Sequence, residues 1–499
     1  MRRRDFLMTS AAALAAPAGA RAAGGVPSLK DAARDLATRP YARTPTVLPP
    51  PFAGLDYDSY RAIRPIPGKA AMLPVGAGFA VDLLPPGLFF PDPITVEILS
   101  DKGLKTVPFS PAVFDFDPRY FGAIPAEAPG AGFTGLRLRY PLNAPDRLDE
   151  VLVLQGASYF RAIGADMVYG LSCRAVAIGT GGAGPEEFPA FWHLRLDPPV
   201  GSMARFETLI DSPSLSGHMD LRLLPGSDTE AEISVTLFPR RDIADIGIAP
   251  LTSMYLKGPL RAAVSDDFRP RVHDSDLLHI ENGQGEHIWR SIANPALIQT
   301  SAFGDVNPRA FGLYQTRRTF ADYVDPEARY HDRPSAIVSP MGDWGAGAVV
   351  LVEIPTGDEF MDNIVAFWRP AEPLRAGGEY RFDYRVTWTR APAAAAGIAR
   401  ILETRSGREH DRPGTLRYVI DFAGDPAGLV ADIRASDGAE VSGMSLFPLP
   451  EEGTFRTTFL FTPGAAEVSE IRLQLLDPEG RPQNPVWLHR WTRARDGGV

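Results

Sequence analysis

Carboxylates, histidines and aromatic rings are concentrated in the stretch VHDSDLLHIENGQGEHIW, residues 272–289. It holds four carboxylates, among them Asp274 and Asp276, together with three histidines and Trp289. Carboxylates can transfer protons, and an aromatic ring offers an apolar face on which a sugar can stack. The stretch has no sustained periodicity, and catalytic residues concentrate on such loops when a rigid sheet carries them. The pattern therefore predicts a functional site on a loop.

A second polar cluster lies in EIPTGDEFMDNIVAFWRP, residues 353–370, where Glu359 and Asp362 follow a strand-like run and precede Trp368. Two carboxylates brought together from separate loops are what hydrolysis of a glycosidic bond requires. One keeps a proton and gives it to the leaving oxygen, while the other activates water or attacks the sugar. The sequence leaves their separation open, and with it the choice between inversion and retention of configuration.

Three further segments carry aromatic and arginine side chains. FADYVDPEARYHDRPSA contains Tyr330 and Arg333, MGDWGAG contains Trp344, and VLQGASYFRAIG covers residues 153–164. Forked guanidinium donors suit sugar hydroxyls, and aromatic rings suit the apolar faces of sugars. The same residues suit a β-core with surface salt bridges equally well, so both interpretations stay open.

Two other interpretations of Asp274 and Asp276 also remain. In the first, both aspartates accept backbone N–H groups in an Asx-type turn and do no chemistry. In the second, they bind a metal ion together with His273, because imidazole and carboxylate groups are common metal ligands. The sequence contains no established metal-binding spacing such as HExxH or CxxC. We therefore predict no metal and no other cofactor.

Strands must position these loops, because the sequence contains few convincing helices. The run YRFDYRVTWT, residues 380–389, alternates apolar and polar side chains with the period of a half-buried strand. Residues 348–355, AVVLVEIP, are apolar on both faces, as in the middle of a sandwich. The 48 prolines and 47 glycines fall between short segments, which indicates many strands joined by turns. One helix is predicted over residues 28–39, with Ser28 as its N-cap, so the fold class is all-β.

The amino terminus reads as an export signal. Arg3 and Arg4 are followed by Asp5-Phe6-Leu7 and an alanine-rich run, which predicts a twin-arginine signal peptide over residues 1–22 and a periplasmic location. A basic tail of a cytosolic protein is the alternative. A membrane anchor is disfavoured, because the run is shorter than the roughly 20 residues that a bilayer requires.

Composition limits the size of the core and the choice of partners. A chain of 499 residues with 44% hydrophobic content can bury a large core, and Cys173, the only cysteine, excludes an intramolecular disulfide. The net charge of −10 disfavours nucleic acid as a partner. No later stretch is apolar for long enough to span a membrane, so we expect no stable membrane insertion.

A domain boundary is predicted at the alanine-rich segment APAAAAGIA, which is either a short helix or a linker. The first domain would cover residues 23–392. The second would cover residues 400–499, where strand-like runs have the spacing of an immunoglobulin-like sandwich.

Blocks along the chain carry a family resemblance. FFPDPITVEI, GFTGLRLRYPLN, LQGASYFRAIG, FRPRVHDSD, NPRAFGLYQ, RPSAIVSPMGDWGAGAVVLVEIPT and DNIVAFWRP occur in this order. Together they resemble the periplasmic glucan biosynthesis proteins of the G and D types, which act on osmoregulated periplasmic glucans, and the twin-arginine leader favours the D type. The resemblance implies a large galactose-mutarotase-like β-sandwich followed by a smaller immunoglobulin-like domain, and it permits a homodimer.

The resemblance also implies β-1,2-glucan as the ligand and, for the D type, endo-hydrolysis of that glucan with inversion. Asp362 in MDNIVAFW matches the general acid of the family, Asp274 in HDSD matches the general base, and Tyr330 matches a residue that relays a proton between water and base. The residues expected to bind substrate are Arg333, Glu359, Trp289, Asp276, Trp344 and Trp368.

The chain departs from the family pattern near both acids. Leu277 stands where glycine is expected, and Phe360 and Met361 stand where polar residues are expected. We expect Phe360 and Trp368 to desolvate Asp362 in part, so that it keeps its proton near neutral pH.

Two rival functions use the same residues. A non-catalytic scaffold would hold nascent glucan and guide backbone synthesis or branching, and a mutarotase-like epimerase is suggested by fold analogy alone. The presence of both Asp274 and Asp362 favours an enzyme.

Overall fold

The computed structural model describes residues 26–43, 46–69, 72–260, 266–390, 399–436 and 438–497. The predicted leader and residues 391–398 of the alanine-rich segment lie outside the described residues. Helix α1 spans Leu29–Ala37, and the hydroxyl of Ser28 accepts the backbone N–H of Asp31 at 3.1 Å. The predicted helix and its cap are therefore confirmed.

Strands make up nearly all of the regular structure in the described chain, which confirms the predicted all-β fold class. One sheet has eleven strands. In spatial order they are β2 (Met72–Gly76), β3 (Phe79–Leu84), β7 (Gly135–Ala144), β8 (Arg147–Gln155), β9 (Tyr159–Ala162), β10 (Ser172–Arg174), β16 (Ile246–Ser253), β25 (Ile364–Pro370), β24 (Ala346–Glu353) and β21 (Gln299–Val306), with β11 (Val176–Ile178) also paired to β16.

A second sheet has fourteen strands and runs through both parts of the molecule. In spatial order they are β29 (Val430–Ala435), β32 (Val468–Leu476), β33 (Val486–Thr492), β20 (His287–Ser291), β19 (Leu277–Glu281), β22 (Ala310–Tyr314), β23 (Ser335–Met341), β26 (Tyr380–Thr389), β15 (Thr229–Pro239), β14 (Leu215–Leu224), β13 (Ala204–Asp211), β12 (Ala190–Leu196), β4 (Thr95–Ser100) and β5 (Gly103–Thr106).

Smaller elements complete the described fold. A four-stranded sheet and two strand pairs are formed by β27 (Ile401–Arg408), β28 (Leu416–Ala423), β31 (Thr454–Thr462) and β30 (Glu440–Leu449), by β1 (Ile63–Pro65) with β6 (Phe114–Phe116), and by β17 (Tyr255–Lys257) with β18 (Val272–His273). The short helices are α2 (Tyr57–Arg61), α3 (Phe320–Tyr323), α4 (Arg493–Asp496), η1 (Pro111–Val113) and η2 (Tyr330–Asp332).

The two large sheets pack face to face as a sandwich. Strand β26 alternates as predicted, and Tyr384, Val386 and Trp388 point into the core. From the other sheet, the ring of Phe160 meets that of Trp388 with centroids 6.3 Å apart. Strand β24 is buried on both faces over its second half, also as predicted.

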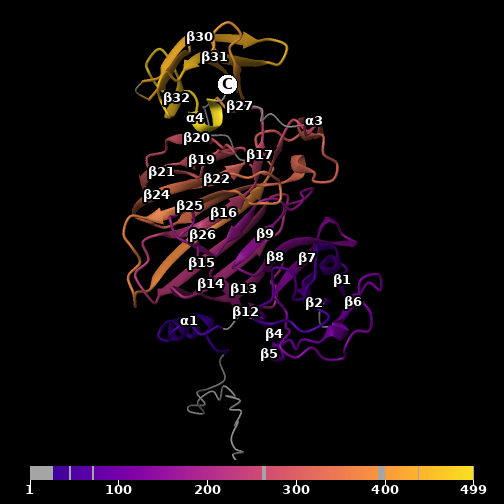
Figure 1. Ribbon diagram of the computed structural model, residues 1–499. Helices are drawn as coiled ribbons and strands as arrows, with labels where there is room; N and C mark the ends of the chain where they lie inside the picture. The colour runs from indigo at the N-terminus through magenta and orange to yellow at the C-terminus, as the bar shows by residue number, and fades with distance from the viewer. Residues whose placement is uncertain are drawn as a thin grey trace, which may run out of the picture.

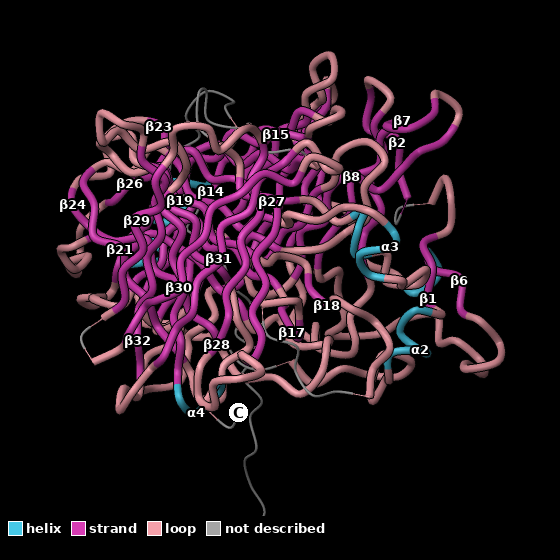
Figure 2. Tube along the Cα trace, turned by 90° about the horizontal axis from the view of Figure 1, so that it is seen from above, coloured by secondary structure: helices cyan, strands magenta, loops and turns pink. Residues whose placement is uncertain are grey.

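The C-terminal part has a core of its own but shares a sheet with the body. Tyr418, Phe459 and Trp487 belong to this second core. Strand β33 pairs in parallel with β20, and Trp289 lies opposite Trp487 in the register. Figure 1 shows β27, β30, β31 and β32 gathered at one end of the molecule, next to β19 and β20. In Figure 2 the strands of this part lie over the body.

Because a continuous sheet joins the two cores, we expect the whole protein to unfold in one cooperative thermal transition. Differential scanning calorimetry of the mature chain measures this. The ratio of calorimetric to van't Hoff enthalpy should be close to one. Two resolved transitions, one for each core, would contradict the expectation.

Candidate active site

Asp274 lies at the end of β18 and is almost fully buried. Its backbone N–H donates to the carbonyl of Met254 at 2.9 Å, which continues the pairing of β18 with β17. Its carboxylate Oδ1 accepts a hydrogen bond from Nη1 of Arg333 at 2.5 Å. Because a buried carboxylate needs a compensating charge, this ion pair fixes the direction of the Asp274 side chain.

Arg333 follows the helical turn η2, and three contacts hold it. Its Nε donates to the carbonyl of Ala328 at 3.1 Å, and its guanidinium lies 4.3 Å from the ring centroid of Tyr330. Gly170 packs against the side chain so closely that an added Cβ would come within 2.8 Å of Arg333 Cβ. The arginine that pairs with Asp274 is thus held in one orientation.

Tyr330 and Glu359, both predicted for the site, contact each other directly. The phenol of Tyr330 donates to Oε2 of Glu359 at 2.7 Å, and Nη1 of Arg269 donates to the same oxygen at 2.7 Å. Arg269 also binds Asp325 at 2.8 Å. Burial and the bond to Glu359 raise the pKa of Tyr330, so the phenol keeps its proton.

Asp362 lies two residues before β25, and 35% of its side-chain surface is exposed. Burial of the remaining side-chain surface raises the pKa of the Asp362 carboxyl. The guanidinium of Arg161, 3.5 Å away, lowers this pKa, and so does the charge of Arg333. The negative charge of Asp274 raises it. Because the charges of Asp274 and Arg333 act on Asp362, the two predicted acids lie near each other.

The backbone of Met254 and Tyr255, where β17 begins, holds both acids. Asn363, the residue after Asp362, is fully buried. Its Oδ1 accepts the backbone N–H of Tyr255 at 2.8 Å, and its Nδ2 donates to the Tyr255 carbonyl at 3.1 Å. The preceding residue, Met254, binds the N–H of Asp274. Two loops far apart in the sequence are therefore tied to two consecutive residues.

Side chains from β9 and β10 border Asp362. Nε of Arg161 donates to Ser172 at 2.6 Å, which directs the guanidinium toward Asp362. Burial raises the pKa of Tyr159, and the charge of Asp362 contributes to that rise. The guanidinium of Arg174 lies 5.1 Å from the ring centroid of Tyr159. The aromatic residues of this segment pointed to it in the sequence, but Arg161 had no signal other than its place in the block LQGASYFRAIG.

Trp344 and Trp368 lie in the core of the sandwich. Trp368 is fully buried, and its ring centroid is 6.3 Å from that of Trp344, whose indole N–H donates to the carbonyl of Asp383. Neither indole offers a face to a sugar. Phe360 is 90% exposed, so it contributes little to the burial of Asp362, whereas Trp368 lies in the core.

Asp276 and Trp289 lie at the junction between the two parts of the molecule. Asp276 accepts the backbone N–H of Thr316 at 2.9 Å and also the hydroxyl of Thr316. Both residues line a cavity of about 40 Å³ together with Glu403 and Trp487. The main partners of Asp274 and Asp276 are thus distant in sequence, unlike those of a local Asx-type turn.

His273 stacks on Tyr255, with ring centroids 5.3 Å apart, and is fully buried. Throughout the ranges that the structure describes, no group of three or more His, Cys, Asp or Glu side chains is placed to hold a metal ion. Within the same ranges, no helix is long and apolar enough to cross a membrane.

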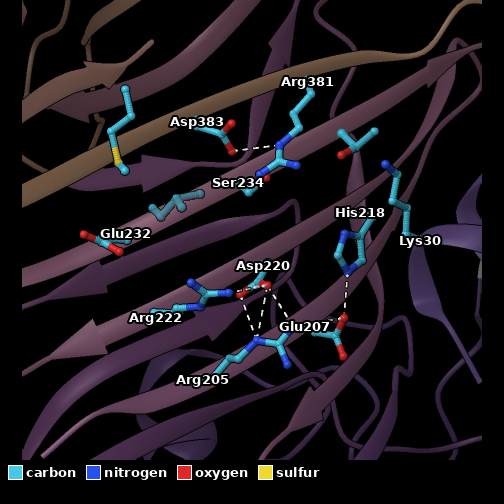
Figure 3. A pocket seen from close by; sticks show the side chains of 13 residues that line it. Lys30, Arg205, Glu207, His218, Asp220, Arg222, Glu232, Ser234, Arg381 and Asp383 are labelled. Atoms are coloured by element: carbon cyan, nitrogen blue, oxygen red, sulfur yellow. Dashed lines mark hydrogen bonds and ion pairs between the residues drawn. The ribbon is translucent and has the colours of Figure 1, made fainter. Parts of the chain in front are cut away.

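Another cavity, of about 500 Å³, lies on the outer face of β13, β14, β15 and β26 (Figure 3). Its charged side chains have ion-pair partners: Arg205 binds Asp220 at 2.8 Å, His218 lies 3.2 Å from Glu207, and Glu232 binds Arg385, outside the cavity, at 2.9 Å. Among the described residues that line it, the imidazole of His218 is the only ring. Because it offers a glucan neither a stacking surface nor an uncompensated carboxyl, the candidate site is the one around Asp274 and Asp362.

The chain is similar to known proteins over nearly its whole length. The family described as "Periplasmic glucan biosynthesis protein, MdoG" matches residues 25–491. A protein named "Glucans biosynthesis protein G" from Vibrio cholerae is 41% identical over 92% of this chain and 85% of its own length. Proteins of the same name from Rhodopseudomonas palustris and Shewanella frigidimarina are 40% and 39% identical, over 93% and 92% of this chain and over 92% and 83% of their own lengths.

We expect His273 to make the free energy of unfolding depend on pH. Burial lowers its pKa to about 4, whereas the unfolded chain takes up this proton near pH 6.5. Between pH 6.5 and pH 4 the unfolded state binds this proton and the folded state does not, so the free energy of unfolding decreases as the pH falls. The loss from His273 is at most about 3 kcal/mol. Denaturant unfolding at pH 7 and pH 4.5 should show a smaller loss for His273→Phe than for wild type. Equal losses would contradict the assignment.

Proposed function

We propose a function on one premise: the chain belongs to the periplasmic glucan biosynthesis protein family. The protein is accordingly periplasmic and acts in association with glucan. Within this family we propose that it is an endo-acting hydrolase of β-1,2-glucan that inverts the anomeric configuration. The observation that carries the proposal is the opposite environment of two neighbouring carboxylates, Asp274 and Asp362.

Asp362 is proposed as the general acid. Burial and the charge of Asp274 raise its pKa, which favours the protonated form that an acid catalyst needs. Its partly exposed carboxyl can still reach a bound sugar chain. Arg161 moderates the rise, so that the proton can also be released.

Asp274 is proposed as the general base. Its pairing with Arg333 at 2.5 Å holds it as a carboxylate directed into the site. Tyr330 stands beside this pair, and its oxygen can accept a hydrogen bond from a water. The phenol donates to Glu359 in the absence of substrate. We propose that it turns to Asp274 when the water is bound, which completes the relay.

The proposed reaction is a single displacement. The water oxygen forms a bond to the anomeric carbon while the glycosidic carbon–oxygen bond breaks. Asp362 gives its proton to the leaving oxygen, and the proton lost by water reaches Asp274 through Tyr330. Water is added across one linkage, and inversion follows because water attacks from the face opposite the leaving group.

Arg333, Glu359 and Arg161 are proposed to bind sugar hydroxyls around the linkage, because each presents a polar group beside the two acids. Asp276 and Trp289 are left out of the sugar-binding set, since they line the junction cavity. Trp344 and Trp368 are left out because they are buried.

A non-catalytic scaffold is the second candidate, and one observation favours it: the relatives are named for glucan biosynthesis. In that role the same arginines would hold a growing chain without cutting it.

Asp362→Asn should remove hydrolysis while keeping the shape of the site, with a loss of rate on the order of 10²-fold or more. Asp274→Asn should do the same. The measurement is the chain length of linear β-1,2-glucan over time, with the first anomer released followed by NMR.

Asp358→Asn, an exposed aspartate on the same loop as Asp362, is the matched control and should cut at the wild-type rate. Undiminished cleavage by Asp362→Asn would show that Asp362 is not the general acid. Glucan binding by wild type without shortening would favour the scaffold.

Arg161→Gln should move the alkaline limb of kcat/KM to higher pH. Activity needs Asp362 protonated, and Arg161 holds the pKa of Asp362 below the value that burial alone would set. Removing the guanidinium therefore extends the protonated form upward in pH. Arg147→Gln, which changes an exposed arginine on the neighbouring strand β8, should leave the limb in place. A limb that stays or moves downward in Arg161→Gln would contradict the assignment.

A further inference from the structure

A buried ion cluster joins the C-terminal part to the strand that ends at Asp274. Arg271 lies three residues before Asp274, and its Nη2 donates to Oε2 of Glu403. Both side chains are almost fully buried. Glu403 belongs to β27, in the four-stranded sheet of the C-terminal part. Separating a buried ion pair leaves its charges uncompensated, which is costly. The pair therefore restrains β27 and the segment before Asp274 relative to each other.

The same cluster reaches the loop that leads to Tyr330. Nη1 of Arg271 donates to the backbone carbonyl of Asp322 at 3.3 Å and lies 3.4 Å from its carboxylate. Arg317 binds that carboxylate at 3.1 Å and lies 3.8 Å from Glu403. Asp322 is also held by the backbone and hydroxyl of Thr319. Glu403 therefore sits opposite two arginines that belong to the body.

Further contacts carry this restraint from the cluster to the catalytic groups. The amide of Gln315 donates to the carbonyls of His273 at 3.3 Å and Tyr330 at 2.8 Å. The ring of Tyr323 meets those of His273 and Tyr330, with centroids 5.2 and 5.9 Å apart. The residue before Asp274 and the relay tyrosine are thus packed on one small core, which the ion cluster borders.

The junction cavity is lined by both parts of the molecule. Its lining includes Asp276 and Trp289 from the body and Glu403 and Trp487 from the C-terminal part. A volume of about 40 Å³ can hold a water molecule between such polar groups. Arg271 thus pairs with Glu403, and Asp276 shares this cavity with the same residue.

We propose that Glu403 is a positioning residue for the catalytic base: through Arg271 it fixes the backbone of residues 271–276 and so the direction of Asp274 toward Arg333 and Asp362. The C-terminal part is then a component of the active site and not an appended module. This inference rests on the proposed function for its kinetic readout, but its structural readout is independent of it.

The test is Glu403→Gln in the full mature chain. We expect kcat on linear β-1,2-glucan to fall by on the order of ten- to a hundredfold, because a small displacement of the base is costly. The affinity for glucan, measured in an Asp362→Asn background, should change less than about twofold, since the sugar-binding groups stay in place. Amide hydrogen exchange should become faster at residues 271–276 and 317–322, where Arg271 and Arg317 hold the backbone around Asp322.

Glu409→Gln is the matched control, because it breaks a pair with Arg417, at 2.7 Å, within the C-terminal part alone. It should leave kcat and the exchange of residues 271–276 unchanged. If Glu403→Gln does not fold, the double variant Arg271→Met and Glu403→Met, which removes both buried charges, takes its place with the same expectations.

Unchanged exchange at residues 271–276 in Glu403→Gln would overturn the proposal. So would a loss of protection spread evenly over the chain, or equal losses of kcat and affinity, because these mark a merely structural role. If wild type does not shorten glucan, the proposed function fails, and the exchange pattern alone decides whether Glu403 positions Asp274.

Discussion

The candidate site depends on two consecutive backbone residues, Met254 and Tyr255. One accepts the N–H of Asp274, and the other is held by the buried amide of Asn363, next to Asp362. This fixes the two carboxylates relative to each other, although the chain supplies them from separate loops. Their environments then diverge, because a guanidinium lies 2.5 Å from Asp274 but 3.5 Å from Asp362, and the charge of Asp274 helps to raise the pKa of Asp362. This difference is the basis of the roles proposed for the two groups.

The sandwich supplies the rigidity that this arrangement requires. Arg161 and Asp362 come from the eleven-stranded sheet, whereas Arg333 lies on the loop between β22 and β23 of the fourteen-stranded sheet. The fourteen-stranded sheet continues into the C-terminal part through the pairing of β20 with β33. Membership of the periplasmic glucan biosynthesis family gives this scaffold its biological setting, and the two carboxylates suggest the chemistry.

Sequence alone was sufficient where a local pattern carries the information. The alternation of β26 and the cap at Ser28 are local, and both were predicted correctly. The sheet that joins the body to the C-terminal part was not predicted, because parallel pairing between β20 and β33 leaves no local pattern in the sequence. Arg161 was missed for the same reason, since its partner Asp362 is 201 residues away. Trp368 could not be recognised as core, because an indole that stacks on sugar and one that fills a sandwich look alike in sequence.

The most direct test of the account is a structure of the Asp362→Asn protein with linear β-1,2-glucan bound. The account predicts one glycosidic oxygen within hydrogen-bonding distance of residue 362, and a water in contact with Tyr330 on the opposite face of that sugar, within reach of Asp274. A glucan chain bound elsewhere, for example on the outer face of β13 to β15, with both carboxylates remote from any linkage, would contradict it.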